Sequence, residues 1–315
     1  MKKQNLLFLS LALLTSCGSK AYAVETINKP SVFANKTVFS DSVSSKLSNL
    51  IETSVISDKN NFVLSPINSS LIDSYKNDKE AFSSLYALVN QKENKFSLTD
   101  NFSVASSSTI NDKNVDNVSY FEGTVDELNN SLSRFYDRKI SLANSGTYYL
   151  SLLELQDYFL VPEKTEDKLP FNSNGTYTYV SMVKNGKYEI KDNYTIFEVS
   201  INATKMRILL PNTDVDISSI SLSEILKEPE SSGRISVKIP EFNVSSEYTD
   251  ASDGYTYHQE NFTFNHYGVK GSSFTVNGPT STSPDYDLTI DVNHSFYFMS
   301  MLEDAPLFAG KITTL

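Results

Sequence analysis

The sequence has little of what most catalytic and metal-binding sites are built from. It contains one cysteine, three histidines and no tryptophan. A single cysteine cannot form an intramolecular disulfide. His258, His266 and His294 do not form an H-E-x-x-H or comparable ligand motif, so we expect no metal site and no cofactor. The chain also lacks a G-x-S-x-G elbow and a phosphate-binding glycine loop. Enzymes are therefore the least supported class, and we expect no catalytic residues.

Positive charge is also scarce. Lys and Arg number 27 against 38 Asp and Glu, which gives a formal net charge of -11 at pH 7. Such a surface repels phosphate backbones, so nucleic acid is excluded as a partner. The densest acidic group, Glu163, Glu166 and Asp167, is typical of a solvated surface rather than an acid–base pair. With 39% hydrophobic and 21% charged residues, the composition is globular.

Long hydrophobic runs are absent except near the N-terminus. Residues 6–14 are almost wholly apolar and follow two lysines. This run is shorter than the about 20 residues that span a bilayer, so it predicts an export signal. The run ends in Leu14-Thr15-Ser16-Cys17, the pattern of a lipobox. We expect residues 1–16 to be the signal peptide and Cys17 to carry the lipid that anchors the exported protein to a membrane of the cell envelope.

A second cleavage pattern stays open. Ala21-Tyr22-Ala23 fits the A-x-A pattern of an ordinary export signal, and cleavage after Ala23 would give a secreted protein. In the lipidated form, residues 17–36 lack periodicity and are expected to be a tether. Residues 37–315 contain no internal repeat and no dividing linker, which predicts one domain.

Hydrophobic periodicity predicts helices first and strands afterwards. Four helices are expected. The first carries an apolar stripe of Phe39, Val43, Leu47 and Leu50, and the second begins near Ser69. The third carries Phe82, Leu85 and Val89, and the fourth carries Leu128, Leu132 and Phe135. Residues 91–118 are interpreted as a loop with one strand at 102–105. The other expected strands are 61–64, 150–155, 177–183, 188–190, 205–210, 234–240, 262–264, 274–276, 288–292, 296–299 and 307–312. This order is typical of an α+β protein.

Short segments with known motifs run along the chain in a fixed order: Asn61–Leu71 (N-x-x-x-S-P-x-S-I), Val180–Val183 (V-x-M-M), Met206–Pro211 (M-x-I-x-L-P), Ile239–Phe242 (L-P-K-F), Asn293–Phe298 (D-H-P-F-L-F) and Leu307–Gly310 (L-F-x-G). In this order they resemble the serpins, the serine protease inhibitor family. The resemblance implies helices packed around three mainly antiparallel or mixed β-sheets. Because the segment between Val89 and Leu128 is short, we expect some helices to be missing. The resemblance also implies a monomer whose partner is a serine or cysteine protease.

The reactive loop is where this sequence departs most from the family. Only Val276-Asn277 matches the family's V-N-E-x-G-T hinge. The expected loop consists of Gly278, Pro279, Thr280, Ser281, Thr282, Ser283, Pro284 and Asp285. The ten residues 278–287 reach at most about 33 Å. Pro279 and Pro284 also lack the N–H that a central strand needs.

These features predict that the cleaved loop does not insert into a sheet, so that classical protease trapping is impaired and cleavage leaves the melting temperature nearly unchanged. The alternative is a non-inhibitory surface binding or adhesion lipoprotein on a β-rich scaffold. A covalent complex with a protease would separate the two.

Overall fold

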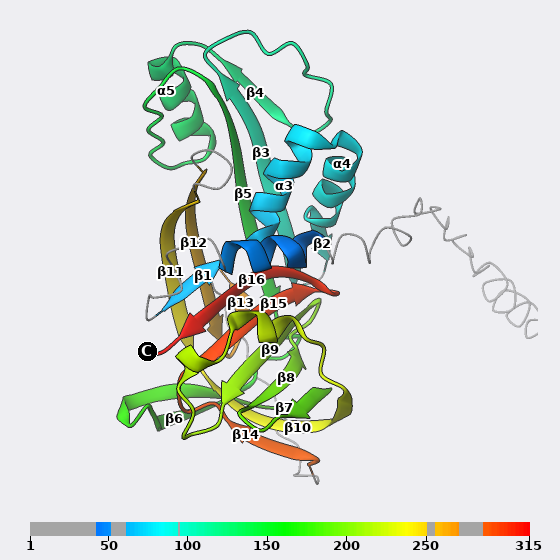
Figure 1. Ribbon diagram of the computed structural model, residues 1–315, viewed down its shortest axis with the longest axis vertical. Helices are drawn as coiled ribbons and strands as arrows, with labels where there is room; N and C mark the ends of the chain where they lie inside the picture. Colours follow the sequence, from blue (N-terminus) through cyan, green and yellow to red (C-terminus); the bar gives the residue numbers. More distant parts are fainter. Residues whose placement is uncertain (1–41, 52–60, 94, 251–255, 271–285) are drawn as a thin grey trace, which may run out of the picture. The chain divides into compact units, whose positions relative to one another are not determined.

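The computed structural model describes residues 42–51, 61–93, 95–250, 256–270 and 286–315 (Figure 1). All of them lie in the unit Thr37–Leu315, and the other unit, Met1–Lys36, lies outside them. The predicted signal peptide, the tether and Cys17 therefore fall outside the described residues. The same is true of the predicted strand 274–276 and of the predicted loop residues 278–285.

The described α-helices follow the predicted apolar stripes. They are 42–51, α3 (Pro66–Asn77), α4 (Lys79–Leu88) and α5 (Val125–Phe135), with 3₁₀ turns η2 (Ile217–Ser219) and η3 (Leu222–Leu226). Helix α3 begins at Pro66 and not near Ser69, because proline suits the first helical turn, where an N–H has no intrahelical partner. A capping box of Thr124 and Glu127 starts α5.

The described strands form two sheets. The first has the order β1 (Phe62–Leu64), β16 (Ala305–Ile312), β15 (Phe296–Leu302), β9 (Thr204–Pro211), β8 (Tyr194–Ser200), β7 (Asn174–Ile190), β10 (Ser231–Pro240) and β14 (Leu288–Asp291), with β6 (Lys164–Phe171) paired to β7. The second has the order β11 (Phe242–Asp250), β12 (Thr256–Asn265), β13 (Gly268–Lys270), β5 (Thr147–Tyr158), β3 (Phe96–Ser106) and β2 (Gln91–Glu93), with β4 (Ser119–Glu122) paired to β3.

The resemblance implies three sheets, whereas the described strands form two. Strand β7 explains the difference, because its hydrogen bonds join two groups of strands into one sheet. Over Tyr179–Tyr188 it pairs with β10, and over Tyr188–Ile190 it pairs with β8. One strand of 17 residues therefore belongs to two groups, and the two predicted strands 177–183 and 188–190 are one. The strands are mostly antiparallel, with parallel pairs at β10–β14 and β3–β4.

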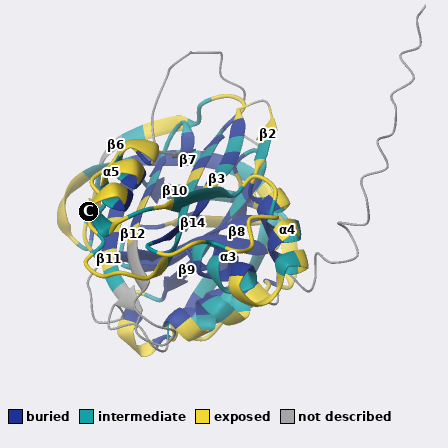
Figure 2. Ribbon diagram, turned by 90° about the horizontal axis from the view of Figure 1, so that it is seen from above, coloured by how far each residue is buried: buried dark blue, intermediate teal, exposed yellow. Residues whose placement is uncertain are grey.

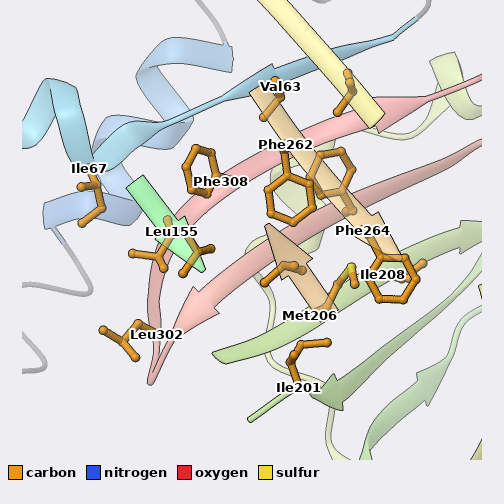
Figure 3. Packing of buried hydrophobic residues seen from close by; sticks show 14 of the residues in the cluster. Val63, Ile67, Leu155, Ile201, Met206, Ile208, Phe262, Phe264, Leu302 and Phe308 are labelled. Carbon is orange, nitrogen blue, oxygen red and sulfur yellow. The ribbon is translucent and has the colours of Figure 1, made fainter. Parts of the chain in front are cut away.

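Side chains from both sheets meet in one apolar core. Val63, Ile67, Leu155, Phe262 and Phe264 all belong to it (Figure 3). Figure 2 shows buried residues along the strands and exposed ones on α5 and the connecting segments. Burial of this continuous surface, without a disulfide, supplies the stability of the described part.

Strand β15 presents different residues to the two faces of its sheet. Phe296 and Phe298 lie in the main core, and Tyr297 points to the opposite face. Tyr297 is also buried, because η2 and η3 cover that face and its hydroxyl donates to the carbonyls of Ile217 and Ile220.

The prediction of a loop over 91–118 is wrong for its first half. Strand β3 covers 11 residues there. Phe96, Leu98, Phe102 and Val104 alternate into the core, but Asp100 interrupts the apolar pattern on the same face. Because Asp100 breaks the run of apolar residues on this face, the sequence pattern did not predict the whole strand.

Candidate functional site

The short strand β13 lies between two long strands and is antiparallel to both. Gly268, Val269 and Lys270 pair with Asn265, Phe264 and Thr263 of β12. On the other side the same three residues pair with Tyr158, Asp157 and Gln156 of β5. β13 therefore occupies a central place in the second sheet, with a strand paired on each side.

The turn that leads from β12 into β13 is held from several sides. The Glu241 carboxylate accepts hydrogen bonds from the backbone N–H of His266 and contacts its ring Nδ1. The carbonyls of His266 and Tyr267 accept from the N–H groups of Glu163 and Phe159. Residues that follow β5 and β10 thus fix the point at which β13 begins.

The end of β5 beside β13 is fixed by a buried carboxylate. Asp157 is fully buried and accepts hydrogen bonds from the backbone N–H groups of Asn202, Ala203 and Thr204, and from the Thr204 hydroxyl. These bonds join β5 to the turn between β8 and β9, because a buried carboxylate is stable only when its oxygens are satisfied.

Beyond β13, the two flanking strands continue without a common neighbour in the described part of the chain. β5 pairs with β3 along 147–157, but its other edge pairs only through 156–158. β12 pairs with β11 over its whole length and with β13 only through 263–265. We call this place, between residues 147–155 of β5 and 256–262 of β12, the open strand position. Such edges are templates for an added strand.

The two faces of β5 at the open strand position differ. Leu153 and Leu155 pack toward the main core, whereas Leu150 and Leu152 pack toward α5. Most of β5 is only partly buried: of its 12 residues, Leu155 and Asp157 are buried. An added strand would therefore need small residues on the core face and could bury apolar ones on the α5 face.

The described chain on either side of residues 271–285 is fixed by pairing. Before them, the chain leaves β12 at Asn265 and pairs as β13. After them, the N–H of Asp287 donates to the Arg234 carbonyl. Strand β14 begins at Leu288, as predicted. The length and proline arguments applied only to 278–287.

The other predicted residues do not converge on a second centre. His266 contacts Glu241, and His294 lies at the Pro211 carbonyl. In the part of the chain that the structure describes, no group of His, Cys, Asp and Glu could hold a metal ion. Glu163 and Glu166 are separated, since they pair with Lys184 and Lys238.

One open cavity of about 570 Å³ lies beside Asp287, with Lys187, Lys205 and Arg234 among its lining residues. These cations are balanced by nearby acids: Lys187 pairs with Glu228, and Glu198 and Asp287 also line the cavity. The cavity therefore has no clear preference for one sign of charge. None of the described helices is both long and apolar enough to cross a membrane.

No family model and no curated protein matches this sequence. Solved structures do share its fold. Serpin48 of the insect Tenebrio molitor has 14% identity and a TM-score of 0.66, covering 89% of this chain and 99% of its own. The thermophilic serpin tengpin in the native state has 13% identity and a TM-score of 0.66, covering 89% and 95%. Human thyroxine-binding globulin has 13% identity and a TM-score of 0.65, covering 87% and 98%.

The chain therefore has a serpin-like α+β fold, with fewer helices than a typical serpin. This confirms the expected fold and the missing helices. The described residues between Val89 and Thr124 contain strands β2, β3 and β4 and no helix.

Proposed function

We propose that this is an exported, lipid-anchored serpin-like protein that acts on a serine or cysteine protease by strand insertion. The observation that carries the proposal is the open strand position, which β13 has begun to fill. The protease would cut within residues 278–285, and the upstream residues 271–277 would then extend β13.

The register of β13 supports insertion of this segment. Counting on from the pair Lys270–Gln156 sets Ser273 opposite Leu153, Phe274 opposite Leu152 and Val276 opposite Leu150. Pro279 falls opposite Thr147, the first residue of β5, where the ladder ends. Residues 271–277 contain no proline, so every residue of the inserted strand keeps its N–H.

The alternation of the segment also suits the two faces. Gly271, Ser273 and Thr275 would face the main core, where Phe262 and Leu155 already fill the space. Phe274 and Val276 would face α5 and cover the partly exposed Leu152 and Leu150. Burying both apolar side chains is worth roughly 4 kcal/mol.

Cleavage is required because the intact chain is too short. If 271–277 inserted fully, the ten residues 278–287 would have to reach from the far end of β5 back to Asp287, and they span at most about 33 Å. Strand β5 alone has 12 residues, roughly 40 Å at 3.3 Å per residue. In Figure 1 α5, at the far end of β5, and β14 lie at opposite ends of the described part.

Incubation of the soluble domain with serine and cysteine proteases tests the proposal. We expect an SDS-stable covalent complex with a target protease and cleavage within 278–285. Two neighbouring serines provide a matched pair. Ser273→Arg would place a charge on the core face and should turn the protein into a simple substrate. Ser272→Arg would face outward opposite Glu154, and should leave the complex unchanged. Cleavage without any complex for both variants and the parent would overturn the trapping function.

The lipid anchor is tested separately. Cys17→Ala should release the protein from membranes or leave an unprocessed precursor, because no other thiol can be lipidated. Normal maturation and unchanged membrane fractionation of this variant would instead favour the secreted form produced by cleavage after Ala23.

A non-inhibitory binding protein is the second candidate. The cavity lined by Lys187, Lys205 and Arg234 favours it, and one solved structure of the same fold is thyroxine-binding globulin in complex with thyroxine. The polar lining would suit a small polar ligand. Absence of reaction with every protease tested, together with ligand-induced stabilisation that Arg234→Ser removes, would favour this function.

A further inference from the structure

A buried carboxyl group lies next to the open strand position and has no role in the proposed function. Asp100 of β3 is 2% exposed. Its Oδ2 accepts a hydrogen bond of 2.6 Å from the Ser151 hydroxyl of β5. Its Oδ1 is buried and has no hydrogen-bond partner among the described residues. Since an unsatisfied buried charge is costly, this side chain calls for an explanation.

The surroundings of Asp100 contain no compensating positive charge. Asp100 forms no ion pair in the described part of the chain. The titratable groups that face it are tyrosines. Tyr86 of α4 donates to the Asp100 carbonyl. Burial raises the pKa of Tyr136, the C-cap of α5, and the charge of Asp100 adds to this rise. Tyr75 of α3 packs against Phe102, the next inward residue of β3. The Asp100 N–H also donates to the neutral side chain of Asn90, so none of these neighbours carries a positive charge that would compensate an ionised Asp100.

We propose that Asp100 makes the β3–β5 pair a proton-operated clamp: the pair is most stable when Asp100 is protonated and loosens when Asp100 is ionised, because an uncompensated buried charge costs more than the bond donated by Ser151 returns. The neutral carboxyl group is the form that an apolar, uncompensated site favours. Because Ser151 belongs to β5, which is one wall of the open strand position, loss of the proton weakens the strand that any inserting segment must pair with.

The electrostatics agree with the geometry. Burial raises the pKa of Asp100 from 3.8 to about 7, and the hydrogen bond from Ser151 opposes part of this rise. For a raised pKa the folded state binds the proton more tightly than the unfolded state. The stabilisation is therefore complete below about pH 4 and is lost as the pH rises from there to about 7.

The first test measures the unfolding equilibrium of the full chain between pH 4 and pH 8. Between the two pKa values of Asp100, the folded state binds about one more proton than the unfolded state. The unfolding equilibrium constant should therefore change about tenfold per pH unit. Asp100→Asn should remove this contribution to the pH dependence of the unfolding equilibrium. Glu154→Gln, which changes an exposed acid of β5, should leave the pH dependence unchanged. Equal slopes in the parent and Asp100→Asn would overturn the clamp.

The second test does not depend on the stability of Asp100→Asn. Carbon NMR of the Asp100 carboxyl group should show a midpoint near neutral pH in the parent. Ser151→Ala should move the midpoint upward, because it removes a bond to the ionised form, and Ser151→Thr should restore it. Hydrogen exchange of the β5 amides should accelerate from pH 6 to pH 8 by more than the intrinsic rate. An ordinary acidic midpoint, or exchange that follows the intrinsic rate alone, would contradict the proposal.

The effect of Asp100 on strand insertion rests on the proposed function, whereas the titration of its carboxyl group does not. A neutral midpoint combined with absence of any protease complex would leave the clamp in place and reject trapping. A protease complex with an acidic midpoint would do the reverse.

Discussion

The pair β15–β16 and the strand β5 are both central strands of their sheets, but they are covered very differently. β15 pairs with β9 and β16, β16 pairs with β15 and β1, and every residue of both strands is buried. β5 has a full neighbour on one side and a neighbour of three residues on the other. Among the described residues, the pair β15–β16, which we call the frame, is closed, whereas the second sheet is incomplete beside β5.

Packing around Gly310 in the frame is close. A Cβ atom added at Gly310 of β16 would lie 2.1 Å from the Phe62 carbonyl and 2.7 Å from the Phe298 ring. Space for even one methyl group is lacking. In the second sheet, Leu150 and Leu152 of β5 are partly exposed, and residues 147–155 have no strand partner on one edge among the described residues. We infer that β15 and β16 contribute more to the stability of this fold than the strands beside the open strand position, which would change during the proposed function.

The largest expected effect is in the frame. Phe296 is fully buried, with ring contacts to Phe171 and Phe242. Phe296→Ala should therefore reduce the free energy of unfolding by about 3 to 5 kcal/mol in chemical denaturation. Phe135→Ala is the control, since that ring is 43% exposed and its loss should cost much less. A loss below about 1 kcal/mol for Phe296→Ala would break the comparison.

The incomplete sheet should gain stability when the connecting segment is cut. Cleavage within 278–285 should raise the melting temperature on the order of 10 °C, because burial of Phe274 and Val276 adds roughly 4 kcal/mol and each kcal/mol is worth about 2 to 4 °C. Calorimetry before and after cleavage measures this. The same cleavage in Ser273→Arg should give no rise. An unchanged melting temperature in the parent would restore the expectation drawn from the sequence alone.

The frame could be predicted from the sequence more completely than the incomplete sheet. Strands β15 and β16 are strongly apolar and end at clear turns, so their position follows from local pattern. β3 was missed in part because Asp100 interrupts its apolar face. Three of the described helices followed from their stripes, since residues at intervals of three and four share one face, whereas α3 was expected only from a start near Ser69.

The open strand position could not be predicted, because it depends on pairing between distant segments. β13 is Gly268-Val269-Lys270, too short to carry a pattern, and its neighbours include β5, more than one hundred residues earlier. The hinge expected at Val276-Asn277 lies outside the described residues and stays a prediction. The predicted loop, residues 278–285, stays a prediction.

Two leucines of the same size sharpen the comparison further. Leu209 of β9 is fully buried between β8 and β15, and Leu152 of β5 is only partly buried. Leu209→Ala should cost about 2 to 5 kcal/mol of unfolding free energy, and Leu152→Ala in the uncleaved protein about 1 kcal/mol. Denaturation curves of both variants at one pH give the difference. Equal costs would mean that β5 is as well covered as the frame.

The smallest expected effect is a coupling that appears only after cleavage. The register sets Phe274 opposite Leu152 on the α5 face, so their side chains should touch once residues 271–277 are inserted. A double-mutant cycle of Leu152→Ala and Phe274→Ala should give a coupling energy of about 0.5 to 1 kcal/mol in the cleaved protein and close to zero in the intact one. The matched cycle of Leu152→Ala and Thr275→Ala should be additive in both, because successive residues of a strand point to opposite faces. Coupling to Thr275 in place of Phe274 would mean that the inserted strand is shifted by one residue, and the absence of coupling in both cycles would mean that the open strand position stays unfilled after cleavage.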